Sequence, residues 1–237
     1  IGTVYHEKIK GLKELSWPKL YLDIGAASRE AAKERVRIGD MACLHQPFVN
    51  LGERYLAKAM DDRIGCAVLV EAARRLPPSL PQGVCFLFSV QEEVGLRGAT
   101  TAAYRLEPDY GFAVDVTSVG DTPEAPLMAV SLGKGPAIKV KDSSVLCHPR
   151  VRELMIETAE REKIPYQLEV LERGGTDAGA IHLSREGIPS GAVSIPCRYV
   201  HAPSEMVDVS DVRHAVNLVM KLSTRAWPLL DSGNGSR

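Results

Sequence analysis

The spacing of apolar residues changes several times between residues 57 and 230. Apolar side chains three or four residues apart predict helices in five segments, 64–76, 95–106, 149–163, 176–187 and 210–226. Short apolar runs between them predict buried strands at 83–90, 110–116, 135–142, 166–172 and 189–196. Because strands alternate with helices of roughly 10–15 residues, the pattern predicts an α/β fold. Its sheet is expected to be mostly parallel and sandwiched by helices.

The first part of the chain has a different pattern. Alternating residues predict a short strand at 19–25, and a second strand is predicted at 40–49. Between them, Ser28 is a candidate N-cap for a helix at 28–36. These segments predict a small β-rich module. We therefore divide the chain into this module, a larger α/β domain and a disordered tail, over residues 1–56, 57–230 and 231–237.

Composition and charge exclude several classes of protein. The chain has 237 residues, of which 45% are apolar and 25% charged, as in ordinary globular domains. A net charge of −1 without a basic run argues against nucleic acid as a partner, and no apolar stretch is long enough to span a membrane. Five scattered cysteines without a CxxC pair predict reduced thiols, as in a cytoplasmic protein.

Several acidic residues and one histidine lie at the ends of predicted elements. Two carboxylates precede a helix, two follow the strand at 83–90, one ends the strand at 110–116, and the histidine follows the last strand. They are Asp61, Asp62, Glu92, Glu93, Asp115 and His201. Because sites in such sheets form beyond the carboxyl ends of the strands, we expect these residues to lie close together.

Carboxylates gathered at one place repel one another, and they stay ionised together only if cations lie among them. A histidine with carboxylates suits Zn²⁺ or a similar first-row divalent ion. The spare carboxylate of the Glu92–Glu93 pair could then serve as a general base that takes a proton from a water molecule on the metal.

Each of these residues also has a purely structural explanation. Asp61 and Asp62 could cap a helix, and Glu92 and Glu93 could lie in a solvated loop. A single histidine such as His201 is more often structural than a metal ligand. Asp115 is harder to explain in this way, because a carboxylate inside an apolar strand needs a partner.

The segment GGTDAGA, residues 174–180, is a further candidate site. Gly174, Gly175, Thr176 and Asp177 open a predicted helix, and a glycine-rich helix start offers backbone N–H groups to an anion or a polarised carbonyl group. The alternative is that Thr176 is a simple N-cap and Asp177 a first-turn charge.

Six segments together resemble one family, the metallo-aminopeptidases of the tetrahedral and glutamyl aminopeptidase group, some of whose members are labelled endoglucanases. The segments are KAMDDRIGCAV, FSVQEEVGLRGA, AVDVT, LGKGPAIKV, GGTDAGAIH and RYVHAPSEMVDVSDV.

The resemblance implies a site with two divalent cations, zinc or alternatively cobalt, on a zinc-peptidase-like fold. Asp61 would bridge the metals, Glu93 and Asp115 would each bind one, and His201 would bind one of them. Glu92 would be the general base. Asp62 would lie behind the metals, joined to Asp61 by a cis peptide bond.

The resemblance also implies how the chain associates, and where it departs from the family. Residues 1–56 would be what remains of a small domain that forms dimers, from which dodecamers are built. The family's first metal ligand is a histidine in an HxDE motif, and neither His6 nor His45 matches it. The chain therefore resembles a member that lacks its N-terminal segment. We expect one cation to be weakly held or lost, and the activity of this chain to be impaired.

Three functions follow from these observations. The first is a metal-dependent aminopeptidase that releases N-terminal residues from peptides. The second is a glycosidase with two carboxylates, although the two tryptophans, Trp17 and Trp227, lie outside the motifs. The third is a truncated subunit without catalytic activity.

Overall fold

The structure is a computed structural model that describes residues 3–6, 20–125 and 127–228. The chain divides into two compact units, Ile1–Leu44 and His45–Arg237. The predicted tail at 231–237 lies outside the described residues. No helix of the described part is both long and apolar enough to cross a bilayer.

The first unit contains a two-stranded antiparallel sheet and one short helix. Strands β1 (Thr3–His6) and β2 (Leu20–Asp23) pair, and α1 spans Arg29–Lys33. The side chain of Ser28 accepts a hydrogen bond from the backbone N–H of Ala31 at 3.2 Å. Ser28 is therefore the N-cap that the sequence predicts. The strand predicted at 40–49 is reduced to β3, which spans Val49–Asn50 and belongs to the second unit.

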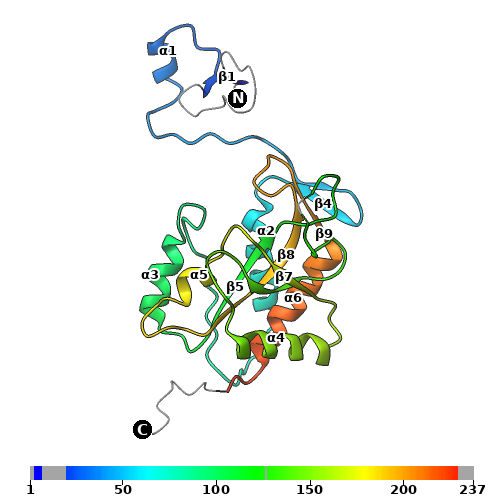
Figure 1. Ribbon diagram of the computed structural model, residues 1–237. Helices are drawn as coiled ribbons and strands as arrows, with labels where there is room; N and C mark the ends of the chain where they lie inside the picture. The colour runs from blue at the N-terminus through cyan, green and yellow to red at the C-terminus, as the bar shows by residue number, and fades with distance from the viewer. Residues whose placement is uncertain (1–2, 7–19, 126, 229–237) are drawn as a thin grey trace. The chain divides into compact units, whose positions relative to one another are not determined.

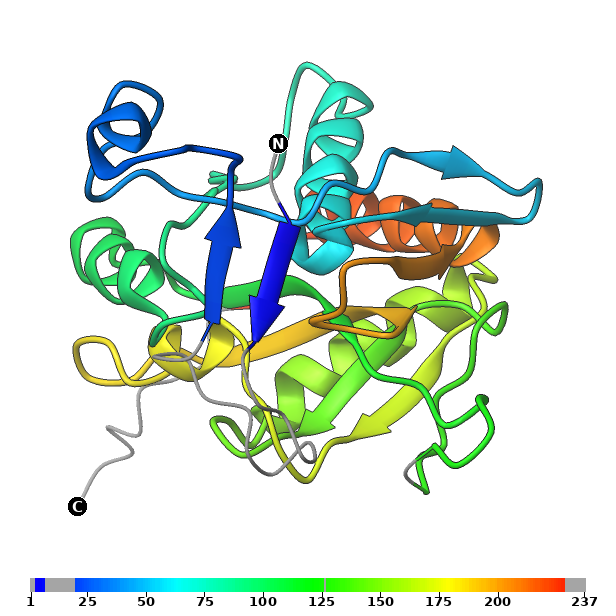
Figure 2. The same ribbon diagram turned by 90° about the horizontal axis from the view of Figure 1, so that it is seen from above.

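The second unit is built on a seven-stranded sheet with the order β3-β4-β9-β8-β6-β7, and β5 pairs with β8 along the other edge of β8. Figure 2 shows the β3–β4 hairpin beside β9. The remaining strands are β4 (Arg54–Ala57), β5 (Gly111–Thr117), β6 (Ala137–Lys141), β7 (Gln167–Val170), β8 (Ser190–Arg198) and β9 (Glu205–Asp208).

The α/β class is confirmed, and the sheet is mixed rather than mostly parallel. Only β5–β8 and β6–β7 are parallel pairs, and the other pairs are antiparallel. The reason lies in the connections. β8 returns as β9 through the short turn at 199–204, and β6 follows β5 through a loop. Neither connection contains the helix that a parallel crossover usually requires.

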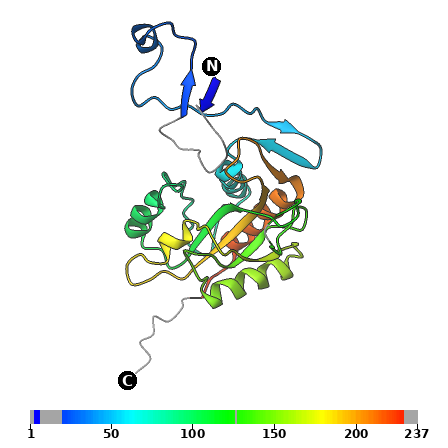
Figure 3. The same cartoon turned by 45° about the horizontal axis from the view of Figure 1, so that its top comes forward.

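Helices cover both faces of this sheet. On one face lie α2 (Met60–Arg74), α4 (Pro149–Arg161) and α6 (Val209–Thr224), visible in Figure 1. On the other lies α5 (Ala178–Ile181), and Figure 3 shows α3 (Arg97–Leu106) beside it.

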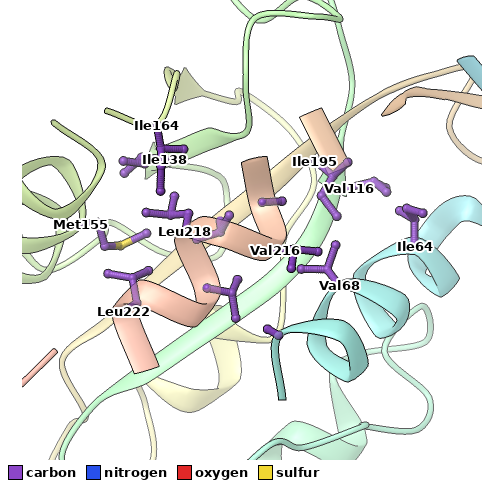
Figure 4. Packing of buried hydrophobic residues seen from close by; sticks show 14 of the residues in the cluster. Ile64, Val68, Val116, Ile138, Met155, Ile164, Ile195, Val216, Leu218 and Leu222 are labelled. Atoms are coloured by element: carbon purple, nitrogen blue, oxygen red, sulfur yellow. The ribbon is translucent and has the colours of Figure 1, made fainter. Parts of the chain in front are cut away.

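Successive side chains of a strand point to opposite sides of the sheet. The side chains of β8 therefore contact the helices on both faces. Val193 and Ile195 join the main core, whereas Ala192 packs with Ala178 of α5. Figure 4 shows the main core, where Val68 and Leu218 of two helices meet the strands. Both side chains are fully buried. Each such burial stabilises the fold by roughly 1.5–3 kcal/mol.

One predicted strand does not form. Residues 83–90 belong to no strand and pair with no strand of the described chain. The continuous apolar run predicts a strand buried on both faces, yet Phe88 is 49% exposed and Val90 is 68% exposed. A run of apolar residues indicates that a strand could be buried. It does not indicate whether a neighbouring strand is present to pair with it.

Candidate functional site

The candidate site lies where several elements of the second unit end. Asp61 and Asp62 begin α2, and Glu92 and Glu93 lie in the turn before α3. Asp115 is near the end of β5, and His201 lies in the turn between β8 and β9.

Asp61, Glu93 and His201 form a compact group. His201 Nε2 lies 2.9 Å from Asp61 Oδ2 and 3.3 Å from Glu93 Oε2. Each residue offers one ligand atom, and these atoms all lie within 4.8 Å of one another. Zn²⁺ ligands at about 2.0–2.2 Å from the ion lie at most about 4.4 Å apart. The separations of 2.9 and 3.3 Å lie within this limit, so the group has a suitable size to hold one divalent cation.

The cluster is held in place by Glu205, a buried residue that sequence reasoning missed. Its carboxylate accepts hydrogen bonds from the backbone N–H of Asp61 at 3.1 Å and of His201 at 2.8 Å. One side chain thus joins two segments that are far apart in the sequence. The only sequence signal is an acidic residue at the start of EMVD, a strand whose Val207 is buried in the core.

Asp62 follows Asp61 directly, and the peptide bond between them is cis, as the resemblance implies. Asp62 Oδ1 accepts a hydrogen bond from the backbone N–H of Gly65 at 3.1 Å. A Cβ atom at Gly65 would lie 2.3 Å from Asp62 Oδ2, so this approach requires glycine. Burial, followed by the negative charge of Asp115, raises the pKa of Asp62 to about 10.

The pKa values of three further carboxylates of the site, Asp61, Glu92 and Asp115, are also raised. Burial, followed by the charge of Glu93, raises the pKa of Asp61 to about 6. Burial, and then Asp177 and Glu93, raises the pKa of Glu92 to about 7. Burial and the charges of Asp61 and Glu92 raise the pKa of Asp115 well above its usual range. The site therefore has an excess of negative charge, which bound cations would relieve.

A network of buried charged side chains lies near Asp115. Lys139 Nζ is 2.8 Å from Glu169 Oε1 and 3.3 Å from Asp142 Oδ2, and all three side chains are essentially inaccessible to solvent. The hydroxyl of Thr117 donates to the same Glu169 carboxylate. The positive charge of Lys139 also opposes the upward shift of the Asp115 pKa.

The segment GGTDAGA contributes one residue to the site. Ser89 donates a hydrogen bond of 2.5 Å to Asp177 Oδ2, and the Asp177 charge acts on Glu92. Gly174 and Gly175 lie against the turn at 143–144. The helix predicted at 176–187 is only the four-residue α5.

The hydroxyl of Thr176 does not cap this short helix. The N-cap position is Asp177, whose side chain makes no capping hydrogen bond, and Thr176 Oγ1 has no partner among the described residues. Because α5 is so short, its N-terminus also has little of the anion-binding capacity that the sequence predicted.

The profile of the M42 glutamyl aminopeptidase family matches residues 3–218. The chain belongs to this family. It is 54% identical over 222 residues to a putative aminopeptidase of Acetivibrio thermocellus, a match that covers 93% of this chain and 67% of the relative. It is 35% identical to the lysyl aminopeptidase of Pyrococcus furiosus, with 91% and 62% covered.

Solved structures agree with the assignment to the M42 family. Aminopeptidase APDkam598 of Desulfurococcus kamchatkensis matches with a TM-score of 0.90 and 37% identity, over 95% of this chain and 65% of its own. The TET1 peptidase of Pyrococcus horikoshii, which can assemble into a tetrahedron or an octahedral shell, matches with a TM-score of 0.82 and 34% identity, over 94% and 66% of the two chains. The chain of this M42 family member thus spans about two thirds of the length of its relatives.

One structural relative bears the endoglucanase label. It is a Thermotoga maritima protein with a TM-score of 0.71 and 29% identity, which covers 88% of this chain and 61% of its own. The label therefore occurs among relatives that share this fold, as the sequence resemblance implies.

Proposed function

We propose that this M42 family member is a metal-dependent aminopeptidase that releases N-terminal residues from peptides by attack of an activated water molecule. The observation that carries the proposal is the group formed by Asp61, Glu93 and His201, whose ligand atoms lie within 4.8 Å of one another. The names of its relatives support the reaction class, since the two curated relatives described above are named a putative aminopeptidase and a lysyl aminopeptidase.

Two divalent cations, zinc or cobalt, would polarise the scissile carbonyl group and lower the pKa of the attacking water. In this proposal Asp61, Glu93 and His201 hold one cation, and Asp61 and Asp115 hold the other. The described residues offer only one group of three potential ligands. The second cation is therefore the more weakly bound of the two.

Glu92 is the proposed general base. Its pKa of about 7 leaves a large ionised fraction at neutral pH, and such a carboxylate can accept a proton from water. Asp62 has a supporting role in this proposal. Its carboxylate accepts a hydrogen bond from the backbone N–H of Gly65 in the first turns of α2. Asp177 lies close enough to act on Glu92, and we propose that it faces the substrate.

The test is hydrolysis of amino-acid anilides by the purified chain before and after complete removal of metal. We expect hydrolysis to stop with a chelator and to return with zinc or cobalt. Hydrolysis that continues at the same rate after metal removal would overturn the proposal.

The second candidate is an endoglucanase, which the label on the Thermotoga relative supports. A soluble cellulose, assayed beside the anilides with the same preparation, separates the two reactions. Activity on cellulose that a chelator does not affect would favour the glycosidase. Metal content below one ion per chain with neither activity would favour a non-catalytic subunit.

The association and location of the chain are also proposals. The assemblies of the Pyrococcus horikoshii TET1 peptidase support self-association into dimers and dodecamers. All five cysteines are free, which supports a reducing compartment such as the cytoplasm. Sedimentation analysis would measure the assembly.

A further inference from the structure

Four neighbouring strands of the second unit each contribute one buried polar side chain to a single hydrogen-bonded group. Strands β5, β8, β6 and β7 lie next to one another in this order. Their residues in the group are Thr117, Ser194, Lys139 and Glu169, and none of these residues is more than 2% exposed. We call them the transverse group, because they run across the sheet from strand to strand.

Glu169 is the centre of the transverse group. Its Oε1 accepts hydrogen bonds from Thr117 Oγ1 at 2.6 Å and from Lys139 Nζ at 2.8 Å. Its Oε2 accepts a hydrogen bond from Ser194 Oγ at 2.6 Å. One carboxylate on β7 therefore binds donors from the other three strands. Side-chain hydrogen bonds thus hold these strands together in addition to the backbone pairing.

Asp115 lies beside the transverse group. It precedes Thr117 by two residues on β5, and residues two apart on a strand point to the same face of the sheet. Ser194 is the register partner of Asp115 on β8. Two of the three donors to Glu169 are therefore strand neighbours of Asp115, the proposed ligand of the second cation.

Stability alone does not account for the charges in the transverse group. Lys139 lies 2.8 Å from Glu169 and 3.3 Å from Asp142, and all three side chains are buried. Taking such charges out of water is costly, and apolar side chains of similar volume often stabilise a core equally well. An ammonium group and two hydroxyl groups that converge on one carboxylate fix its position, which apolar side chains cannot do. The group therefore favours precise placement of β5 and β8.

The carboxylate of Asp115 is itself bonded to the backbone. Its Oδ1 accepts a hydrogen bond from the N–H of Val116 at 2.7 Å. Val116 lies between Asp115 and Thr117, so a movement of the backbone at Thr117 alters the geometry of this bond. Exchange of the Val116 N–H with solvent therefore reports whether Asp115 keeps its orientation.

We propose that Glu169, oriented by Lys139, is a positioning residue for Asp115. By binding Thr117 and Ser194, it holds the ends of β5 and β8 so that the Asp115 carboxylate keeps one orientation toward the second cation. This inference rests on the proposed function, in which Asp115 is a ligand of that cation. Residues that orient a metal ligand in this way typically raise the affinity for the metal by about 10–100-fold.

The first test removes one hydroxyl group from the metal-free chain. Thr117→Val keeps the shape of the side chain and loses its bond to Glu169, whereas Thr117→Ser keeps the bond. Exchange of the Val116 N–H is measured relative to that of Ala113 on the same strand, so that a general loss of stability cancels. We expect Thr117→Val to accelerate exchange at Val116 by about two- to tenfold, which corresponds to the loss of one hydrogen bond. Thr117→Ser should exchange as slowly as the unchanged chain.

A buried hydroxyl group outside the transverse group provides the control. Thr158 on α4 is also fully buried, and it donates a hydrogen bond to the backbone oxygen of Leu154 at 2.7 Å. Thr158→Val removes this bond at a distance from Asp115 along the chain and on a different element. We expect it to lower the free energy of unfolding without accelerating exchange at Val116 relative to Ala113.

A second pair of variants repeats the comparison on β8. Ser194→Ala removes the other hydroxyl bond to Glu169, so it should act like Thr117→Val. Ser190→Ala is its control, because the Ser190 hydroxyl is buried on the same strand but donates to the backbone oxygen of Ile188 at 2.8 Å. Agreement between the two pairs would show that the effect arises from the bonds to Glu169.

The second test is titration of each variant with Zn²⁺ in competition with a coloured chelator. Asp115→Asn identifies the second cation, because that cation should be lost in this variant. We expect Thr117→Val and Ser194→Ala to weaken binding of the second cation by about tenfold and to leave the first unchanged. Thr117→Ser and Thr158→Val should bind both cations as the unchanged chain does.

The results distinguish this inference from the proposed function. If the unchanged chain binds two cations, but Thr117→Val and Ser194→Ala leave the Val116 exchange or the second affinity unaltered, the inference is wrong and the proposed function stands. Equal effects in Thr158→Val or Ser190→Ala would also overturn the inference, since the transverse group would then contribute stability alone. If the unchanged chain binds no second cation, the two-cation part of the proposed function fails together with the inference.

Discussion

At the scale of single residues, the site depends on how buried carboxylates are partnered. Glu205 shows this most directly, because its two oxygens each accept a backbone N–H from a different segment. Glu92 differs in that its pKa is raised to about 7 by burial and by neighbouring charge. The first carboxylate holds two backbone segments together, and the second is the proposed general base.

Replacing Glu92 tests its proposed role. Glu92→Gln preserves the shape of the side chain and removes the basic group, so we expect kcat to fall by about 10²–10⁴-fold. The metal content should stay the same. Glu93→Gln is the comparison, since it should lower the metal content as well. Metal analysis beside anilide hydrolysis separates the two effects, and a Glu92→Gln variant with unchanged kcat would contradict the assignment.

Replacing Glu205 should weaken the fold and the site together. Glu205→Gln replaces one accepting oxygen by an NH₂ group that faces a backbone N–H, and we expect a loss of about 1–3 kcal/mol of unfolding free energy. Urea denaturation measures it. Glu153→Gln on the exposed face of α4 is the control, where only a surface ion pair with Arg150 is lost and the effect should stay below about 1 kcal/mol.

The buried thiol of Cys147 gives a pH prediction. Burial raises its pKa to about 11 from an ordinary value of 9.0. Because the folded value is the higher one, the protonated thiol favours the fold below pH 9, and this contribution is lost as the pH rises through 11. We expect labelling of native Cys147 at pH 8 to be far slower than that of exposed Cys43. Equal rates in the folded chain would show that the thiol is accessible.

At the scale of elements, the start of α2 shows a local requirement that overrides helix propensity. Gly65 lies inside a helix, where replacing glycine by alanine ordinarily stabilises by up to about 1 kcal/mol. Here a Cβ atom would lie 2.3 Å from the Asp62 carboxylate. The close approach of Asp62 therefore determines which residue this helix position accepts.

We therefore expect Gly65→Ala to lower the free energy of unfolding, whereas this replacement ordinarily raises it inside a helix. The variant should be destabilised, and its affinity for the first cation reduced, because Asp62 and its neighbour Asp61 must move. The exposed helix position Ala67 provides the comparison, since Ala67→Gly should cost about 1 kcal/mol without any change in metal binding. A thermal melt and a zinc titration of both variants decide between these outcomes.

Much of this arrangement follows from the sequence, and the exceptions have physical causes. The rule that sites form beyond strand ends predicts the meeting of Asp61, Glu93 and His201, which the structure brings together. Glu205 was missed because one buried acid in a four-residue strand leaves no periodic signal. The strand at 83–90 was predicted from side chains alone, whereas a strand requires a partner for its backbone.

At the scale of the whole molecule, cation binding should stabilise the second unit. A ligand that binds only the folded state adds about 2.7 kcal/mol when its concentration is 100 times Kd. We expect zinc to raise Tm in proportion to the logarithm of its concentration. Asp61→Asn should lose most of this shift, because Asp61 is the proposed ligand common to both cations. A zinc-dependent Tm that survives in Asp61→Asn would locate the stabilising ion elsewhere.

The bond between Glu205 and the N–H of Asp61 joins positions separated by 144 residues. It lies where β4 meets β9, with Ala57 opposite Glu205. Contacts over such a separation form late, since a long loop must close first. We therefore expect a chain that is still being synthesised to bind the proposed cation only after β9 has been made, so that metal binding follows folding and does not direct it.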